Sequence, residues 1–224
     1  MSEEISQYEI GRHKVNILGQ VVDYSFGELF KIIRATLQFE RYDGQMSKPM
    51  TRINFERADS VGILLYDPDR DEVVLTEQFR YPVYASLDPD EATGVGAKKA
   101  WLLEIVAGVQ DAGKTVIEVA QKELFEEAGY RIETDGSWHL IAKIYPSPGG
   151  SSERIYLYWA RVNREDRTSE GGGIAEERED IRVLSLSFKE ALGMVERGEI
   201  QDAKTIIALQ YLAIQKIKGS KSIG

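Results

Sequence analysis

A predicted helix at residues 115–128 is the feature that most constrains this chain, because it must place negative charge beside a hydrophobic core. Thr115 and Glu118 have the spacing of a capping box, which favours the start of a helix, and Gly129 favours its end. The sequence therefore predicts a helix with defined ends in this segment.

Three carboxylates share one side of this predicted helix. At about 100° per residue, Glu123 and Glu127 lie within about 40° of each other, and Glu126 lies about 60° from Glu123. The residues expected to face the core lie on nearly the same side, and they are Val116, Val119 and Ala120. Like charges that leave water need partners, and a bound divalent cation would supply one. The alternative is a solvated acidic face that pairs with basic residues such as Lys122.

Composition and charge narrow the class of protein. The 224 residues are 42% hydrophobic, which is enough for a core in one or two domains, and none of them is cysteine. The net charge of -9 argues against nucleic acid as a partner, because binding to its phosphates depends on clustered Lys and Arg. No apolar run reaches the roughly 18 to 20 residues of a membrane span, and the first residues are acidic rather than basic. We therefore expect a cytoplasmic protein that binds neither nucleic acid nor membrane.

The hydrophobic pattern divides the chain into three parts. Residues 1–57 are expected to form a small antiparallel β module, with strands at 30–42 and 51–57 that alternate apolar and polar residues. Such a module is too thin to bury both its faces. Residues 58–216 are expected to form the main α/β domain, and residues 217–224 a flexible tail.

Within the main domain, the expected strands are 61–66, 72–78, 138–144, 155–162 and 181–186, and the expected closing helices are 188–197 and 203–216. Trp101 and Leu102 lie in a short apolar segment and are expected in the core. Residues 86–99 are expected to form a surface loop. Residues 164–178, which contain three consecutive glycines, are expected to form a mobile loop.

The segment from Gly108 to Tyr130 reads GVQDAGKTVIEVAQKELFEEAGY and resembles the Nudix box, G-x5-E-x7-R-E-U-x-E-E-x-G-U, in which U is a bulky apolar residue. The positions that match, the last of them loosely, are Gly108, Glu123, Leu124, Glu126, Glu127, Gly129 and Tyr130. Lys114 and Lys122 stand where the box has Glu and Arg. Similarity to the bacterial ADP-ribose pyrophosphatase branch of the Nudix hydrolases extends over roughly residues 44–212.

The resemblance implies a fold, an activity and a cofactor. The fold would be a Nudix α/β/α sandwich with a small N-terminal antiparallel β module, exchanged between the two subunits of a homodimer. The activity would be hydrolysis of the pyrophosphate bond of ADP-ribose to AMP and ribose 5-phosphate. The cofactor would be Mg²⁺, with Mn²⁺ as a substitute.

The resemblance also implies roles for particular residues. The metal ligands would be the backbone carbonyl of Ala107 and the carboxylates of Glu123, Glu126, Glu127 and Glu179. Glu177 matches the residue that orients or deprotonates the attacking water, so Glu177 and Glu127 are the candidate catalytic residues. The candidate substrate-binding residues are Arg80, Glu153 and, from the N-terminal module, Arg52.

Two alternatives remain open on the sequence alone. Ile53 follows Arg52 where several ADP-ribose enzymes have an acidic residue near the base, and an apolar side chain cannot accept a hydrogen bond from adenine. The substrate could therefore be GDP-mannose or another nucleoside diphosphate sugar. Lys114 and Lys122 instead leave open a binding protein that senses ADP-ribose and cleaves it poorly.

Overall fold

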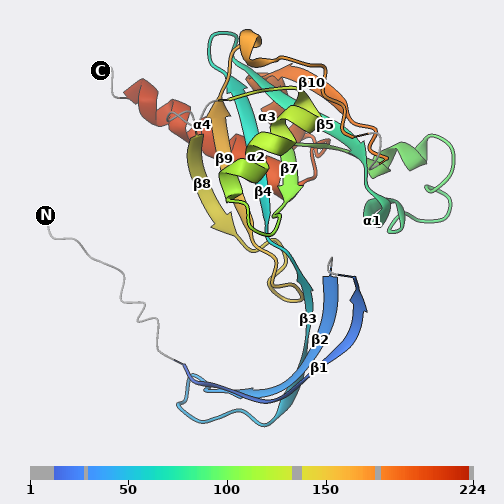
Figure 1. The fold of residues 1–224 in the computed structure, drawn as a ribbon, viewed down its shortest axis with the longest axis vertical. Helices are drawn as coiled ribbons and strands as arrows, with labels where there is room; N and C mark the ends of the chain where they lie inside the picture. The colour runs from blue at the N-terminus through green and yellow to red at the C-terminus, as the bar shows by residue number, and fades with distance from the viewer. Residues whose placement is uncertain (1–12, 28–29, 133–137, 175–177, 222–224) are drawn as a thin grey trace, which may run out of the picture. The chain divides into compact units, whose positions relative to one another are not determined.

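The computed structural model describes residues 13–27, 30–132, 138–174 and 178–221 (Figure 1). It divides into two compact units. One unit comprises residues 1–57 with 147–152, and the other comprises residues 58–146 with 153–224. Among the described residues, no helix combines the length and apolar character that a membrane-spanning segment requires.

The smaller unit is a three-stranded antiparallel sheet in the order β1–β2–β3. The strands are β1 (Val15–Phe26), β2 (Phe30–Phe39) and β3 (Met50–Arg57). The last two confirm the two predicted strands of the module. Every residue of β1 is exposed, including the large apolar ones, which are Val15, Ile17, Leu18, Val21, Val22, Tyr24 and Phe26. Within this unit the sheet therefore leaves apolar surface uncovered, as expected for a module this thin.

The larger unit is built on a mixed seven-stranded sheet, with the order β10–β5–β4–β9–β8 and with β6 and β7 paired to β5 and β4. The strands are β4 (Ser60–Asp67), β5 (Glu72–Phe79), β6 (Trp101–Glu104), β7 (Val106–Val109), β8 (Trp138–Ile144), β9 (Ile155–Arg161) and β10 (Arg182–Ser187). The pair β4–β9 is parallel and the other pairs are antiparallel. All five strands predicted for this domain are confirmed.

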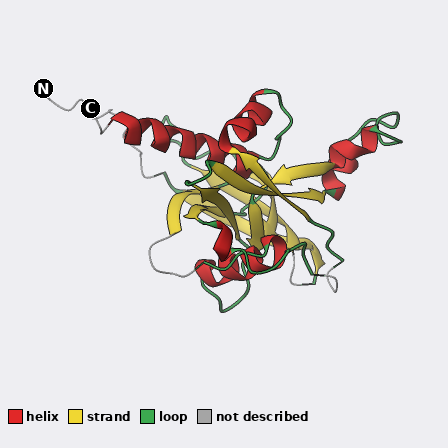
Figure 2. Cartoon of the chain, turned by 90° about the horizontal axis from the view of Figure 1, so that it is seen from above, coloured by secondary structure: helices red, strands yellow, loops and turns green. Residues whose placement is uncertain are grey.

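Helices cover both faces of this sheet (Figure 2). The main ones are α2 (Val116–Glu123) with its π-helical continuation η2 (Leu124–Ala128), α3 (Phe188–Glu196) and α4 (Ala203–Lys221). Shorter helical segments are α1 (Tyr81–Tyr84), η1 (Gly96–Ala100) and η3 (Arg164–Asp166).

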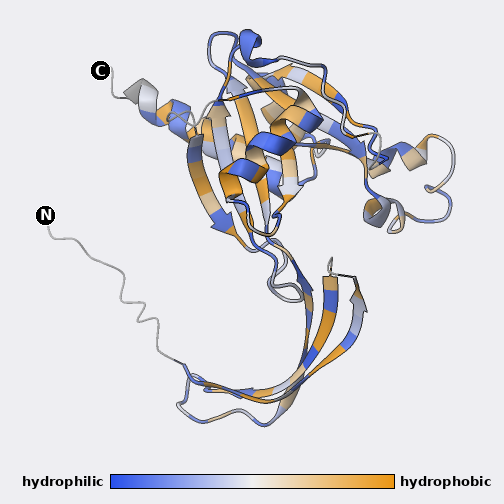
Figure 3. Cartoon of the chain, in the orientation of Figure 1, coloured by the Kyte–Doolittle hydropathy of each residue, from blue (hydrophilic) through white to orange (hydrophobic). Residues whose placement is uncertain are grey.

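Strand β4 shows why two helical layers are needed, because all its residues are buried. Successive strand residues point to opposite faces. Ile63 and Leu65 pack in one cluster with α2, whereas Leu64 and Tyr66 pack in another with α3 and α4. Figure 3 shows the apolar residues along β4 and the strands beside it in the sheet. This arrangement confirms the predicted α/β/α sandwich.

Three expectations need correction. Trp101 is 44% exposed and so lies outside the core, because β6 pairs only with β5 and sets Trp101 opposite the exposed Phe79. The segment expected to be a surface loop, residues 86–99, ends in the 3-10 helix η1, which begins at Gly96. The tail expected to begin at residue 217 is helical at its start, because α4 continues to Lys221.

Candidate active site

Helix α2 begins with the predicted capping box. The Thr115 hydroxyl accepts a hydrogen bond from the Glu118 N–H, and the Glu118 carboxylate accepts one from the Thr115 N–H at 2.7 Å. After Glu123 the helix widens to π-helical geometry, and it ends at Gly129 with a left-handed φ of 78°. Single π-turns interrupt α-helices frequently at functional sites. A 3.6-residue period does not predict this turn.

Glu127 is the buried carboxylate of this helix, with only 3% of its surface exposed. Its Oε2 accepts a hydrogen bond from the Ala107 N–H at 3.3 Å. Burial raises the pKa of Glu127 to about 8, and the charges of Glu123 and Glu179 add to that effect, although the Ala107 N–H opposes it. The inward orientation predicted for this side chain is confirmed, because the carboxylate is buried beside two further acidic groups that raise its pKa.

Gly108 lies against the second carboxylate, that of Glu123. A Cβ atom added at Gly108 would come within 2.2 Å of Glu123 Cγ and 2.3 Å of its Oε1. Real Cβ contacts are never this short, so only glycine leaves room for the carboxylate at this point of β7. Close approach of backbone to a functional group is one reason for a glycine inside a strand.

Lys122 balances part of the acidic charge. Its ammonium group lies 3.0 Å from Glu126 Oε2 and 3.9 Å from Glu123 Oε1. The hydrogen bond to Glu126 raises the pKa of Lys122 despite partial burial. The lysine thus keeps the charge expected of the arginine in the Nudix box, without the planar fork of a guanidinium.

The glycine run at residues 171–173 docks onto the end of the π-helical turn. The N–H groups of Gly172 and Gly173 donate to the carbonyl oxygens of Glu127 and Glu126, both at 2.9 Å. A Cβ at Gly171 would come within 2.4 Å of the Glu127 oxygen. The glycines therefore satisfy carbonyls at the helix end that would otherwise lack partners. The sequence prediction of a mobile loop missed this role.

Glu179 follows this run, and its negative charge helps to raise the pKa of Glu127. Glu179 Oε2 accepts a hydrogen bond from the Ile174 N–H at 3.1 Å. A Cβ at Gly173 would come within 2.5 Å of Glu179 Cβ. The glycine run thus packs against the backbone of Glu127 and against the side chain of Glu179.

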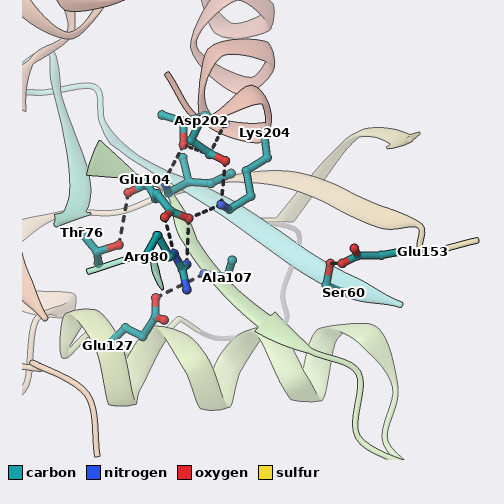
Figure 4. Close-up of polar contacts among 11 residues, drawn as sticks. Ser60, Thr76, Arg80, Glu104, Ala107, Glu127, Glu153, Asp202 and Lys204 are labelled. Atoms are coloured by element: carbon teal, nitrogen blue, oxygen red, sulfur yellow. Dashed lines mark hydrogen bonds and ion pairs between the residues drawn. The ribbon is translucent and has the colours of Figure 1, made fainter. Parts of the chain in front are cut away.

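A row of alternating charges begins beside Glu127 (Figure 4). Arg80 donates two hydrogen bonds to Glu104, from Nε to Oε1 at 2.6 Å and from Nη2 to Oε2 at 2.9 Å. Lys204 also contacts Glu104, and it lies 3.0 Å from Asp202. Glu104 is the most buried of these groups, with 2% of its side chain exposed.

The pKa values of this row show that the charged forms are stable. Burial disfavours the charged carboxylate of Glu104, but the hydrogen bonds from Arg80 and the charge of Lys204 outweigh it and lower the pKa. Burial likewise opposes the charged guanidinium of Arg80, yet the bonds to Glu104 and the charge of Glu127 raise its pKa. Arg80 therefore presents a fixed positive charge beside the acidic helix.

A cavity of about 560 Å³ lies next to these groups. Its lining combines charged, polar and aromatic side chains, which are Gln78, Phe79, Arg80, Trp101, Arg178, Glu179 and Asp180. The cavity is large enough for a small ligand. Arg80 and Glu179 thus share one cavity, where a phosphate and a cation could both find charges of opposite sign.

The donor chemistry fits a divalent metal ion. Carboxylate oxygens are the ligands that Mg²⁺ prefers. Burial raises the pKa of Glu127, the charges of Glu123 and Glu179 raise it further, and a bound cation would favour the charged form of this carboxylate. In the described part of the chain, however, no three acidic or histidine side chains already stand close enough together to hold an ion. One carboxylate oxygen of Glu179 instead accepts the hydrogen bond from the Ile174 N–H.

Three of the predicted site residues remain, and they are Glu153, Arg52 and Glu177. Glu153 accepts a hydrogen bond from the Ser60 hydroxyl at 3.0 Å, in a separate part of Figure 4. Arg52 lies on β3 of the smaller unit, where its Nη1 donates to the Thr51 carbonyl at 3.0 Å. Glu177 lies outside the described residues.

Sequence reasoning assigned no role to Glu104 or Lys204. Both lie in segments that resemble the family. Glu104 is a charged residue in an apolar strand and Lys204 lies at the start of a helix, and neither local sequence indicates that the two side chains contact each other. Their contact joins residues 100 positions apart. Only the folded chain shows it.

Comparison with known proteins shows which family the chain belongs to. The fold is an α/β/α sandwich, and its candidate site combines carboxylates on a capped helix with an arginine beside them. A family model described as "NUDIX domain" matches residues 56–209. The chain therefore belongs to the NUDIX domain family.

Similar proteins include two curated pyrophosphatases. The ADP-ribose pyrophosphatase of Escherichia coli (strain K12) is 35% identical over 206 residues, which cover 91% of this chain and 90% of the relative. The GDP-mannose pyrophosphatase of Cronobacter sakazakii is 33% identical over 88% of this chain and 95% of the relative. A solved structure described as "Crystal structure of ADP compounds hydrolase" has a TM-score of 0.63 at 18% identity, and covers 92% of this chain and 96% of its own. This structural similarity supports the assignment of the fold.

Proposed function

We propose that this chain hydrolyses the pyrophosphate bond of ADP-ribose and releases AMP and ribose 5-phosphate. The observation that carries the proposal is the buried Glu127, which stands near Glu123, Glu179 and the cationic Arg80. The ADP-ribose pyrophosphatase of Escherichia coli, similar over nine tenths of both chains, supports this choice of substrate.

The acidic groups would hold the cofactor. Glu123, Glu127 and Glu179, with help from Glu126 and the Ala107 carbonyl, would bind Mg²⁺, or Mn²⁺ in its place. When bound, the ion would neutralise charge on the diphosphate and so favour attack at phosphorus. Gly108 leaves the Glu123 carboxylate the space that it occupies.

Other side chains would bind the substrate and move a proton. Arg80 would hold a phosphate oxygen by a charge-assisted hydrogen bond. Glu153 and Arg52 are assigned to substrate binding on the family resemblance, as is Glu177 to the role of base. A water oxygen would bond to phosphorus as its proton passes to Glu177, and the bridging P–O bond would break.

A second candidate substrate is GDP-mannose. The similarity to the GDP-mannose pyrophosphatase of Cronobacter sakazakii favours it, as does Ile53, which is 59% exposed on β3 and offers adenine no acceptor. The chemistry at phosphorus would be the same, because the two substrates share a diphosphate. Only the groups that contact base and sugar would differ.

The assembly is proposed to be a cytoplasmic homodimer that exchanges its N-terminal module. The exposed apolar residues of β1 support it, because large apolar patches on a sheet usually mark an interface. A second subunit would cover surface that the small sheet cannot bury alone.

The proposal is tested by the Glu127→Gln variant, with Glu196→Gln at the end of α3 as the matched control. We expect the rate of AMP release from ADP-ribose at saturating Mg²⁺ to fall at least about 100-fold in Glu127→Gln. A loss of this size is typical of removing a group that stabilises charge in the transition state. The rate of the control variant should stay near that of the wild type. Unchanged turnover in Glu127→Gln would contradict the proposed active site. Tight binding of ADP-ribose by the wild type without any AMP would indicate a sensor instead.

A further inference from the structure

Glu104 contacts Arg80 in a way that fixes the plane of the guanidinium. Two parallel hydrogen bonds join both carboxylate oxygens to Nε and Nη2. Such a two-pronged contact sets the orientation of an arginine as well as its distance. Nη1, the third guanidinium nitrogen, has no hydrogen bond with any residue that the structure describes, and Arg80 is 37% exposed at the cavity.

Glu104 is itself held from the opposite side. Lys204, 11% exposed, contacts the carboxylate from the first turn of α4 and is paired with Asp202 at 3.0 Å. Asp202 Oδ2 in turn accepts hydrogen bonds from the Thr205 N–H at 3.0 Å and from the Thr205 hydroxyl at 2.5 Å. The start of α4 is therefore rigidly connected to the carboxylate.

A second link ties α4 to the strand that carries Glu104. The Thr205 hydroxyl oxygen accepts a hydrogen bond from the Ile105 N–H at 2.8 Å, next to Glu104 in sequence. The Thr76 hydroxyl, on the paired strand β5, donates to the Glu104 carbonyl at 3.3 Å. The side chain and the backbone of Glu104 are thus both anchored by other residues of the chain.

Charge explains why Lys204 accompanies the pair. A carboxylate bonded to a single arginine would cancel most of the positive charge that a phosphate needs. Lys204, itself paired with Asp202, shares the negative charge of Glu104, so that part of the positive charge of Arg80 stays available to an anion. Stability alone does not require such a network, because apolar residues of similar volume commonly replace buried ion pairs without loss.

From these contacts we infer that Glu104 and Lys204 are positioning residues, which hold the Arg80 guanidinium in the orientation that binds a substrate phosphate. The inference rests on the proposed function, because it deepens the role assigned to Arg80. It adds two residues that touch neither substrate nor metal ligand and that act through the arginine.

The experiment measures binding rather than turnover. Calorimetry gives the Kd of α,β-methylene ADP-ribose, which is not cleaved, for wild type, Glu104→Gln, Lys204→Met, Arg80→Ala and the double variant Glu104→Gln/Arg80→Ala. Thermal unfolding is recorded for each, and titrations are run well below the lowest Tm. Glu199→Gln, which removes a carboxylate from the exposed ion pair with Arg197, is the matched control.

We expect Kd to rise about tenfold in Glu104→Gln and about threefold in Lys204→Met, as for loss of one charge-assisted contact. The double variant should bind no more weakly than Arg80→Ala alone, because the effect passes through the arginine. With ADP-ribose as substrate, KM should rise in Glu104→Gln while kcat changes less than threefold. Glu199→Gln should match wild type.

The outcomes separate the inference from the proposed function. If Arg80→Ala weakens binding but Glu104→Gln and Lys204→Met lower only the Tm, the positioning role is wrong and the pair is structural. If the Kd of the double variant exceeds that of Arg80→Ala by the same factor by which Glu104→Gln alone raises the Kd, the carboxylate does not act through Arg80. If Arg80→Ala binds as tightly as wild type, the phosphate contact in the proposed function fails.

Discussion

Gly108 has no side chain, and the Glu123 carboxylate occupies the space that a Cβ atom would need. The nearest approach would be 2.2 Å, so an alanine must displace either the strand or the carboxylate. Gly149 is different, because no atom lies within 4 Å of the corresponding Cβ.

We expect Gly108→Ala to lower kcat/KM for ADP-ribose about 100-fold, since a displacement near 1 Å of a catalytic group has effects of that size. Gly149→Ala should leave kcat/KM unchanged. Steady-state kinetics with circular dichroism spectra of both variants checks this. A Gly108→Ala variant with wild-type kinetics would show that the Glu123 position is not critical.

Residue-level reasoning from the sequence found Glu127 but not its neighbours across the sheet. Helical spacing alone places Glu127 on the side of Val119 and Ala120, and all three are buried. Arg80 could be assigned only by family resemblance. Glu104 could not be assigned at all, because its partners come from β5 and α4, and no local pattern records a contact across 100 residues.

At the scale of elements, helix α2 is fixed at its start by the capping box. Thr115 and Glu118 satisfy each other's backbone N–H groups, and the helix then carries its carboxylates toward β7. The predicted boundaries of strands and helices agree with the structure where alternation or caps are strong. The π-helical turn at 124–128 was missed, because its geometry depends on packing against the glycine run 171–173.

We expect Thr115→Ala to lower the free energy of unfolding by about 1 kcal/mol, the usual effect of losing an N-cap hydroxyl. Thr115→Ser keeps the hydroxyl and should stay within a few tenths of a kcal/mol of wild type. Urea denaturation of the three proteins measures the difference. Equal destabilisation by both substitutions would mean that the methyl group of Thr115, rather than its cap, matters.

At the scale of the whole molecule, the smaller unit has more apolar surface than it can bury. Alternation predicted its sheet, but β1, exposed along its full length, was not predicted as a strand. A strand without a buried face has no regular burial pattern within one chain. A partner subunit would give these residues a buried environment.

We therefore expect light scattering to give twice the mass of a single chain. Val22→Glu, at an exposed apolar position of β1, should shift the protein toward the monomer, because a buried unpaired charge opposes association. Ser25→Glu, at a polar position of the same strand, should remain dimeric. A monomeric wild type at micromolar concentration would contradict the proposed assembly.

Product analysis across two substrates tests the account most directly. Wild-type protein is incubated with ADP-ribose or with GDP-mannose, each with Mg²⁺ or with EDTA, and the nucleotide and sugar phosphate products are quantified by chromatography. We predict AMP and ribose 5-phosphate in equal amounts from ADP-ribose with Mg²⁺, little GMP from GDP-mannose, and neither product with EDTA. Faster release of GMP than of AMP would contradict the choice of substrate, and AMP release that persists in EDTA would contradict the role given to the carboxylates of α2.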